Sequence, residues 1–230
     1  DMNDHQTDPE FAERWEHFAF EEVVREEGQQ LDEITRRLAI LAVLMGCQGL
    51  EEFKLAVPRA LDGGLSPVMI KELIYQGVDY LGMGRVRPFL DAANGIFVER
   101  GIPLPLPKQG TTTMENRLER GVEVQAEIFG EAMKEAWKKG HINRWLAANC
   151  FGDYYTRTGL TLAQREMITF CFLAAQGGCE PQLIAHAGGN MRLGNDKAFL
   201  VKVVSQCLPY IGYPRSLNAM ACIDKAAAQK

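Results

Sequence analysis

The sequence lacks the features that mark membrane proteins and nucleic-acid-binding proteins. Its apolar runs are short, since even residues 38–45, one of the longest, fall far below the roughly 20 residues that a membrane span needs. The formal net charge is −5, and no basic stripe runs along the chain to displace counterions from a phosphate backbone. We therefore expect a globular protein with a small-molecule substrate and neither a membrane nor a nucleic-acid partner.

The sequence also lacks a secretion signal, a disulfide framework and a metal-ligand pattern. None of the six cysteines belongs to a Cys-x-x-Cys pair, and no His-x-x-x-His pair occurs, so we predict reduced thiols, no metal and no cofactor. No signal-peptide pattern is visible, which favours a cytoplasmic location. Because the chain opens at Asp1 rather than at Met, a removed leader and a periplasmic location stay open.

Alternation typical of strands is weak, and the pattern throughout is helical. Asp8 followed by Pro9 and Ser66 followed by Pro67 are helix starts, and Phe11, Trp15 and Phe18 recur at a spacing that predicts one buried helix face. Residues 38–45 and 167–175 are apolar on all sides, which places two helices at the centre of a bundle. The sequence thus predicts an all-α protein.

The order of these segments repeats. Arg14-Trp15 recurs as Arg144-Trp145, and the Tyr80-Leu-Gly motif recurs as Tyr210-Ile-Gly, each 130 positions later. We predict two tandem helical-bundle repeats, residues 1–103 and 113–230, joined by a proline-containing linker at 104–112. The tryptophans at positions 15, 137 and 145 have spacings that suit core packing.

The two repeats differ at the positions where proton transfer is plausible. His186 lies in the segment 180–186, and Glu166 precedes the second apolar helix; the corresponding positions in the first repeat carry Ala56 and Arg37. Imidazole titrates near neutral pH and is a common proton donor and acceptor. We therefore predict that only the second repeat carries a working site, while the first completes the fold and lends one wall of a pocket.

The motifs of the second repeat resemble those of the carboxymuconolactone decarboxylase family. They are Arg165-Glu166 before an apolar helix, a Glu-containing turn that leads to His186, a break at Leu193-Gly194, and a Tyr-x-Gly-x-Pro ending at 210–214. The first repeat matches more loosely. The resemblance implies the alkylhydroperoxidase D-like helical fold in a two-repeat form.

One activity that the resemblance implies is loss of carbon dioxide from a small carboxylated, unsaturated lactone, without a cofactor. In that reaction His186 would donate the proton, Glu166 would orient the imidazole, and Arg165 would balance a substrate carboxylate. Gln182 and the hydroxyl of Tyr210 are further candidates to bind the substrate, although Tyr80 and Tyr210 are expected mainly to pack between the repeats.

A second implied activity is the thiol-dependent peroxidase chemistry of alkylhydroperoxidase D. That relay uses Glu, Cys-x-x-Cys and His, but here the second cysteine position is Gln182, so Cys179 has no local partner. Catalysis by Cys179 alone stays an alternative. A third possibility is a non-catalytic binding protein on the same fold, in which His186 is dry and tightly packed. The resemblance also implies a homo-oligomer, with a trimer expected first and a dimer second.

Overall fold

The protein is built from helices alone within residues 3–229, the part of the chain that the computed structural model describes. The all-α prediction is confirmed. The helices are α1 (Asp4–Thr7), α2 (Pro9–Glu16), η1 (His17–Glu22), α3 (Val23–Arg25), α4 (Glu33–Gly46), α5 (Leu50–Asp62), α6 (Pro67–Leu81), α7 (Met83–Glu99), α8 (Arg117–Phe129), η2 (Glu131–Lys139), α9 (His141–Trp145), η3 (Leu146–Tyr155), α10 (Leu162–Gln176), α11 (Glu180–Arg192), α12 (Lys197–Ile211) and α13 (Tyr213–Ala228).

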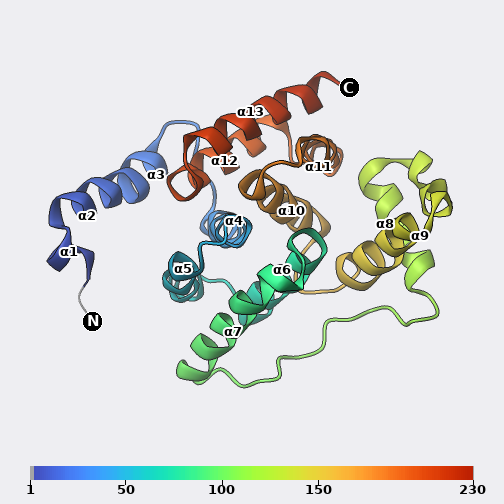
Figure 1. The fold of residues 1–230 in the computed structure, drawn as a ribbon, viewed down its shortest axis with the longest axis horizontal. Helices are drawn as coiled ribbons and strands as arrows, with labels where there is room; N and C mark the ends of the chain where they lie inside the picture. The colour runs from blue at the N-terminus through green and yellow to red at the C-terminus, as the bar shows by residue number, and fades with distance from the viewer. Residues whose placement is uncertain (1–2, 230) are drawn as a thin grey trace.

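The helix order confirms the tandem repeat. Helices α5, α6 and α7 begin at Leu50, Pro67 and Met83, and α11, α12 and α13 begin 130 positions later in each case. Segments η1 and η3 are both π-helical and precede α4 and α10 respectively. A helix-free connection at 100–116 joins the two repeats and runs along one side of the molecule in Figure 1.

Side-chain caps fix the starts of the inner helices. Asp32 accepts a hydrogen bond from the Thr35 amide at the start of α4. Thr161 and Gln164 form a reciprocal capping box at the start of α10. Each cap satisfies amide groups that the first helical turn leaves without partners.

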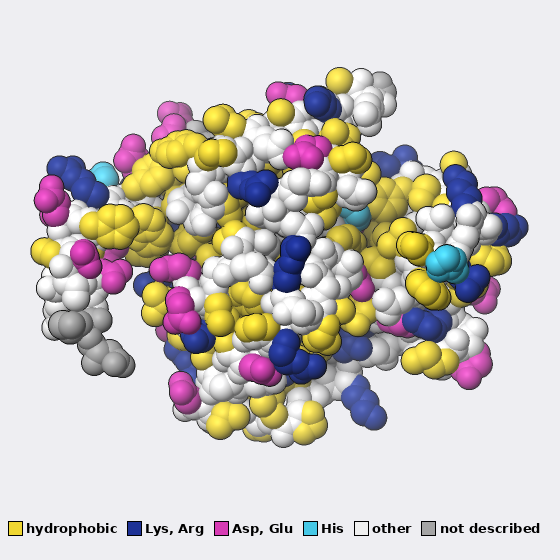
Figure 2. Space-filling view, viewed as in Figure 1, with side chains coloured by type: hydrophobic (Ala, Val, Ile, Leu, Met, Phe, Trp, Pro, Cys, Tyr) yellow, Lys and Arg dark blue, Asp and Glu magenta, His cyan; other side chains and the backbone are white. Residues whose placement is uncertain are grey.

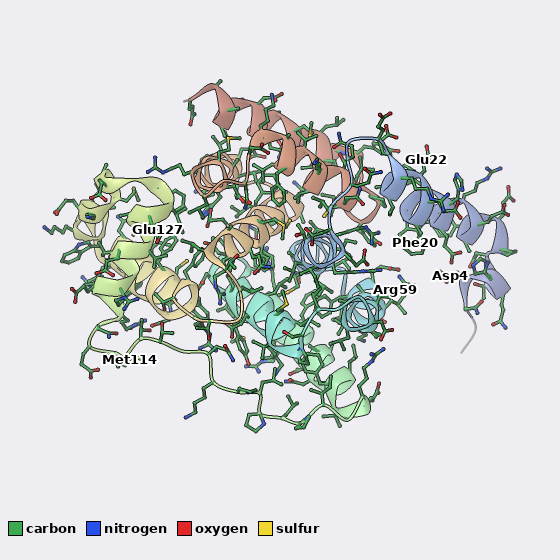
Figure 3. The ribbon with its side chains drawn as sticks, turned by 180° about the vertical axis from the view of Figure 1, so that it is seen from behind. Asp4, Phe20, Glu22, Arg59, Met114 and Glu127 are labelled. Atoms are coloured by element: carbon green, nitrogen blue, oxygen red, sulfur yellow. The ribbon has the colours of Figure 1, made fainter. Side chains whose placement is uncertain are left out.

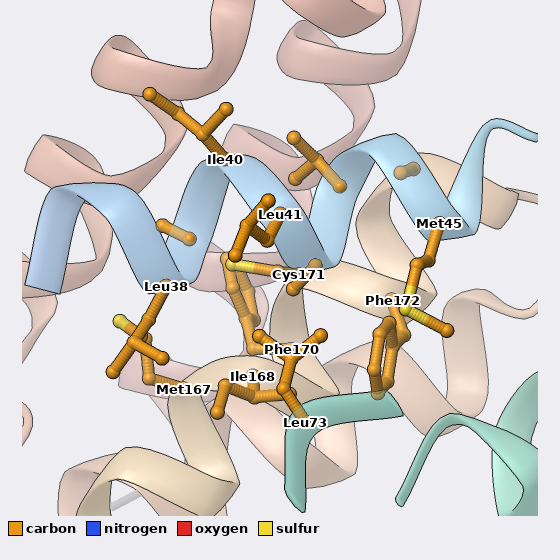
Figure 4. Packing of buried hydrophobic residues seen from close by; sticks show 14 of the residues in the cluster. Leu38, Ile40, Leu41, Met45, Leu73, Met167, Ile168, Phe170, Cys171 and Phe172 are labelled. Atoms are coloured by element: carbon orange, nitrogen blue, oxygen red, sulfur yellow. The ribbon is translucent and has the colours of Figure 1, made fainter. Parts of the chain in front are cut away.

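Helices α4 and α10 lie against each other at the centre of the molecule (Figure 1). Residues 38–45 of α4 and 167–175 of α10 are all buried, and both belong to one hydrophobic cluster that continues through the inner faces of α5–α7 and α11–α13. Figure 4 shows Leu41 and Met45 of α4 packed against Cys171 and Phe172 of α10. The two repeats therefore share a single core.

Buried polar contacts also cross between the repeats. Arg165 of α10 donates to Gln76 Oε1 of α6 at 3.1 Å. Arg36 of α4 donates to Gln206 Oε1 of α12 at the same distance. Gln76 and Gln206 are equivalent positions, 130 residues apart, so the central helix of each repeat is bonded to the third helix of the other.

Helices α8, η2, α9 and η3 form a group at one end of the molecule, while α1–α3 lie at the opposite end (Figure 1). Within the group, α8 packs on η3 and encloses a small second apolar cluster around Ile128 and Phe151.

Two of the expected core aromatics lie at the surface. Phe11 is 65% exposed and Trp145 is 58% exposed, so the prediction that both pack in the core is wrong. The reason is their position on α2 and α9, at the ends of the molecule, where no further element of the described chain covers these faces. Figure 2 shows apolar side chains gathered over these end regions. None of the described helices is long and apolar enough to cross a membrane.

Candidate active site

A histidine–carboxylate pair joins α10 to α11. His186 Nδ1 lies 2.9 Å from Glu166 Oε2 and 3.2 Å from Oε1. Glu166 is fully buried and His186 is 8% exposed. Because a carboxylate accepts and does not donate, Nδ1 carries the proton of this contact, and Nε2 is left as the reactive nitrogen. Nε2 has no hydrogen-bond partner within residues 3–229.

Two residues one turn beyond His186 hold this pair in place. The Asn190 side chain donates to the carbonyl oxygens of Glu166 and of His186, at 2.9 and 2.8 Å, which ties α11 to α10. At Gly189, a Cβ atom would lie 2.9 Å from Glu166 Oε2 and 2.7 Å from Ile128 Cγ2. The close approach of the helix to the carboxylate therefore requires glycine at this position.

Two tyrosines extend the network behind Glu166. The Tyr155 hydroxyl donates to Glu166 Oε1 at 2.9 Å and lies 2.8 Å from the Tyr80 hydroxyl. Burial, followed by neighbouring ionisable groups that include Glu166, raises the pKa of both phenols well above the ordinary value, so both stay neutral. The ring of Tyr80 also lies edge-on to His186, with 5.5 Å between the ring centroids.

His186 of this pair borders a cavity of about 490 Å³, while Glu166 lies behind it. Its apolar lining comes from α8, η2, η3, α10 and α11, and consists of Phe129, Met133, Leu146, Phe151, Leu173 and Ala185. Asp79 and Tyr80 of α6 also line it, so the first repeat contributes a wall. No lysine or arginine from the described part of the chain is among the lining residues.

The structure brings four of the six predicted site residues together. His186 and Glu166 form the pair, and Cys179 and Gln182 line the same cavity as His186. The thiol of Cys179 lies 3.6 Å from the Leu173 carbonyl oxygen, to which it donates. All six cysteines of the chain are free thiols.

Arg165 and Tyr210 do not reach this cavity. Arg165 is 1% exposed and its Nη2 donates to Glu72 Oε1 at 3.0 Å, in an ion pair buried between α10 and α6. Tyr210 lies at the other end of the molecule, edge-on to Trp15 with 5.7 Å between the ring centroids. We predicted from the sequence that both residues bind substrate at this site. Their positions correct this prediction, because neither lines the cavity.

Tyr210 instead lines the equivalent hollow of the first repeat, which has a volume of about 190 Å³. Tyr210 is equivalent to Tyr80 of the larger cavity, and Glu52 is equivalent to Gln182. The two members of each pair are 130 positions apart in the sequence. The position of His186 is taken by Ala56, and Arg59 lies 5.2 Å from the ring centroid of Phe20. Figure 3 shows Phe20 and Arg59 between the N-terminal helices and α5. No histidine from the described part of the chain lines this hollow, and the nearby pair of His5 and Glu16 is exposed, unlike the buried pair at the larger cavity.

Sequence reasoning missed two polar residues of the larger cavity, Asp79 and Gln125. Both carboxylate oxygens of Asp79, and Oε1 of Gln125, are buried without a hydrogen-bond partner in the described structure. Burial raises the pKa of Asp79 to about 8; the Cys150 thiol lowers it, Asp153 raises it and Arg165 lowers it, all to smaller extents. The available signal was an aspartate in a largely apolar helix, directly before the repeated Tyr80.

The arrangement is suited to moving one proton at a carbon or oxygen atom of a small, largely apolar ligand. A neutral imidazole held at Nδ1 accepts a proton at Nε2, and an imidazolium stabilised by Glu166 donates one there. Within residues 3–229, no group of three or more His, Cys, Asp or Glu side chains has the arrangement of a metal site.

Comparison with known proteins gives two matches. The model of the family described as "Carboxymuconolactone decarboxylase family" matches residues 9–95 and again 141–225. A protein named 4-carboxymuconolactone decarboxylase, from Acinetobacter baylyi, is 28% identical over 120 residues, which cover 46% of this chain and 83% of that protein. Residues 96–140 lie outside the family match, and they include the cavity-lining residues of α8 and η2.

Proposed function

The chain belongs to the carboxymuconolactone decarboxylase family, and from this premise we propose that it is an enzyme that protonates a carbon atom of a small unsaturated acid or lactone, most directly in a decarboxylation. The observation that carries the proposal is His186 on the cavity wall, bonded at Nδ1 to the buried Glu166 and with Nε2 unbonded. The catalytic group is His186, and Glu166 is a positioning residue. The family resemblance implies that no cofactor takes part.

Decarboxylation needs a proton and a place for an electron pair. When the bond between the carboxylate carbon and the ring breaks, carbon dioxide leaves and the bonding electrons pass into the conjugated lactone, whose carbonyl oxygen becomes negative. The imidazolium of His186 then transfers its Nε2 proton to a ring carbon, which forms the new C–H bond and leaves neutral imidazole. Water returns the proton to Nε2, so one proton is consumed in each cycle.

The apolar lining favours this chemistry. Water competes poorly in a cavity walled by Phe129, Leu146 and Phe151, and removal of a carboxylate from water weakens the solvation that stabilises the starting acid. A low effective dielectric constant also strengthens the interaction of the developing negative charge with nearby donors.

The test is turnover of 4-carboxymuconolactone, the compound in the relative's name, followed by release of carbon dioxide. We expect His186→Ala to lower kcat by about 10²-fold to 10⁴-fold, the usual contribution of a proton-transfer group, with an unchanged circular dichroism spectrum. Glu166→Gln should lower kcat while the variant still binds substrate. His141→Ala is the matched control, because His141 is exposed on α9, and its kcat should equal that of the wild type. Unchanged turnover in His186→Ala would remove the assignment.

Thiol chemistry at Cys179 is the alternative that the same cavity supports, because Cys179 lines it beside His186. Our proposal requires that Cys179→Ala decarboxylates at the wild-type rate within about threefold. A peroxide-reducing activity that is abolished by Cys179→Ala, together with no loss of carbon dioxide from any lactone acid tested, would favour the alternative.

A further inference from the structure

Asp79 lines the cavity with a carboxyl group that lacks a strong hydrogen-bond donor. Both of its oxygens are buried without an N–H or O–H partner from residues 3–229, and the donor beside them is the weak thiol of Cys150. A buried ionised carboxylate with no donor is strongly disfavoured, because nothing replaces the water that it loses. The group must therefore gain a proton, a ligand donor, or both.

The surroundings of Asp79 favour the neutral acid. From η3, Asp153 repels a negative charge on Asp79, and the thiol of Cys150 is close enough to stabilise one slightly. From α10, Arg165 attracts such a charge, but its guanidinium is already paired with Glu72. Helices α4 and α7 also pack on α6 and contribute none of the largest influences on this pKa. With a pKa of about 8, the carboxyl group carries its proton at neutral pH.

A neutral carboxylic acid is a hydrogen-bond donor. Besides His186, the other side chains with donors that line this cavity are three glutamine amides, the Tyr80 hydroxyl and the Cys179 thiol. The Tyr80 hydroxyl already lies 2.8 Å from that of Tyr155, and no lysine or arginine of the described chain lines the space. A carboxylic acid kept protonated by an apolar site can stabilise an oxygen atom that becomes negative during a reaction.

We propose that Asp79 is a second catalytic residue of the cavity, whose O–H donates a hydrogen bond to the substrate carbonyl oxygen that gains negative charge as carbon dioxide leaves. The proposal rests on the proposed function and divides the work between the repeats. His186 of the second repeat delivers the proton to carbon, and Asp79 of the first repeat stabilises the oxygen. No proton leaves Asp79 during the cycle, so the atom balance of the decarboxylation is unchanged.

The assignment also narrows the class of substrate. A neutral donor in a largely apolar space suits a conjugated carbonyl compound with one carboxylate that is lost. A second carboxylate would meet no lysine or arginine of the described chain in the cavity. We expect a monocarboxylated lactone or enone to be turned over with a higher kcat/KM than 4-carboxymuconolactone.

The first experiment follows the proton of Asp79 without turnover. Infrared difference spectra of the full chain, titrated from pH 6 to pH 10, should show a protonated-carboxyl C=O band that disappears with a midpoint near pH 8. Asp79→Asn should lack this band, and Asp91→Asn, which removes an exposed acid on α7, should keep it. Absence of the band from the wild type at pH 6 would overturn the proposal.

The second experiment tests the hydrogen bond with 4-nitrophenolate as the probe, since its oxygen carries the charge of an enolate and its ionisation is visible in absorbance. We expect Asp79→Leu to weaken phenolate binding by about tenfold or more, the effect of losing a hydrogen bond to a charged group. Asp79→Asn keeps an N–H donor and should stay within about threefold of the wild type. Equal affinities in all three proteins, or equal losses in both variants, would overturn the assignment.

The third readout is the pH dependence of kcat. In the wild type one component of the fall in kcat should have its midpoint near pH 8, where Asp79 loses its proton, and this component should be absent from Asp79→Asn. The need for a protonated His186 is the same in both proteins and is not removed by the substitution. A merely structural role of Asp79 would leave the component near pH 8 in place. The two proposals can fail separately. If His186→Ala still turned substrate over while the infrared band of Asp79 and the binding of 4-nitrophenolate behaved as described, the proposed function would be wrong. The assignment of Asp79 as a hydrogen-bond donor would remain. If Asp79→Leu does not fold, the wild-type titration and Asp79→Asn decide the question.

Discussion

Neighbouring residues in one helix have different roles here because each points about 100° away from the last. Glu166 points toward α11 and meets His186, while Arg165, one position earlier, points toward α6 and meets Glu72. The sequence motif Arg165-Glu166 therefore serves two ends of one polar network, the candidate site at Glu166 and the contact between the repeats at Arg165, which are connected through Tyr155, Thr169 and Gln76.

The carboxyl group of Asp79 should make stability depend on pH. Its pKa is 3.8 in the unfolded chain and about 8 in the fold, so between these values the folded state holds a proton that the unfolded state has released. The contribution of Asp79 to stability is therefore lost as pH rises from about 4 to about 8.

We expect Asp79→Asn to remove this loss. The free energy of unfolding of the variant, relative to the wild type, should rise between pH 5 and pH 8 by roughly 1.4 kcal/mol for each pH unit at most, measured by urea denaturation. Parallel pH profiles in the two proteins would contradict the prediction. Asp91→Asn should leave the profile unchanged.

Gly189 should be sensitive to even one added methyl group. In Gly189→Ala the new Cβ would meet Glu166 Oε2 and Ile128, so we expect kcat to fall more than KM rises and stability to fall by about 1–3 kcal/mol. Gly188→Ala is the control on the same helix, because a Cβ there meets nothing within 4 Å. Equal behaviour of the two variants, by kinetics and thermal unfolding, would show that this close approach does not position Glu166.

The candidate pair was accessible to prediction from sequence, but the rest of the site was not. His186 and Glu166 stand out because the first repeat offers an internal comparison, with Ala56 and Arg37 in their places. Asp79 differs from its counterpart Pro209 as well, but its burial against Cys150 and Asp153 of η3 could not be foreseen, because η3 is distant in sequence. Tyr210 was placed in the wrong cavity because each tyrosine lines the hollow of the other repeat.

At the scale of helices, the outer wall of the cavity depends on a backbone contact between α8 and η3. A Cβ on Gly121 would lie 1.8 Å from the carbonyl oxygen of Ala147. This approach is much closer than any side chain allows, so only glycine lets the two segments pack at this distance.

We expect Gly121→Ala to separate α8 from η3, to lower stability by about 1–3 kcal/mol and to raise KM, because Phe129 and Phe151 lie on the two separated segments. Hydrogen exchange of the α8 amides should accelerate. Glu127→Ala, an exposed change on the same helix (Figure 3), should alter neither measurement. Unchanged exchange in Gly121→Ala would contradict the packing.

Helices were the most predictable elements. Caps such as Ser66 and apolar runs such as 38–45 depend on local chemistry, which a single sequence contains. The exposure of Phe11 and Trp145 was not predictable from spacing. A periodic apolar face indicates that a helix can pack against another element, but it does not show whether the same chain provides that element.

At the scale of the whole molecule, the single core predicts a single unfolding transition. The crossed contacts of Arg36 and Arg165 and the packing of α4 on α10 join both repeats in the main hydrophobic core, and only the small cluster around Ile128 lies within one repeat. Fluorescence of Trp15, in a variant with phenylalanine at the other two tryptophans, should change at the same denaturant concentration as the helical circular dichroism. Two separate midpoints would contradict this.

The exposed apolar side chains at the ends of the molecule favour self-association, for which the family resemblance implies a trimer first and a dimer second. Phe11 is 65% exposed and Ile142 68% exposed, at opposite ends of the chain's fold, and large apolar surfaces of this kind commonly mark interfaces. Light scattering of the wild type should give a molar mass that is a multiple of the 25.7 kDa of one chain. Ile142→Asp should lower this mass toward that of the monomer. Met114→Asp, in the connection between the repeats, should leave it unchanged. A monomeric wild type would contradict the expectation.

The crossed placement of Tyr80 and Tyr210 has a consequence for how such a protein can change. A chain with one repeat would have to borrow this tyrosine from a second copy, and every substitution would then appear in all of its sites at once. Fusion of the two halves releases that constraint. The hollow of the first repeat can then change independently, and it is now lined by aromatic side chains and Arg59. The cavity of the second repeat keeps the imidazole of His186 and gains Asp79, an acid that the first repeat contributes.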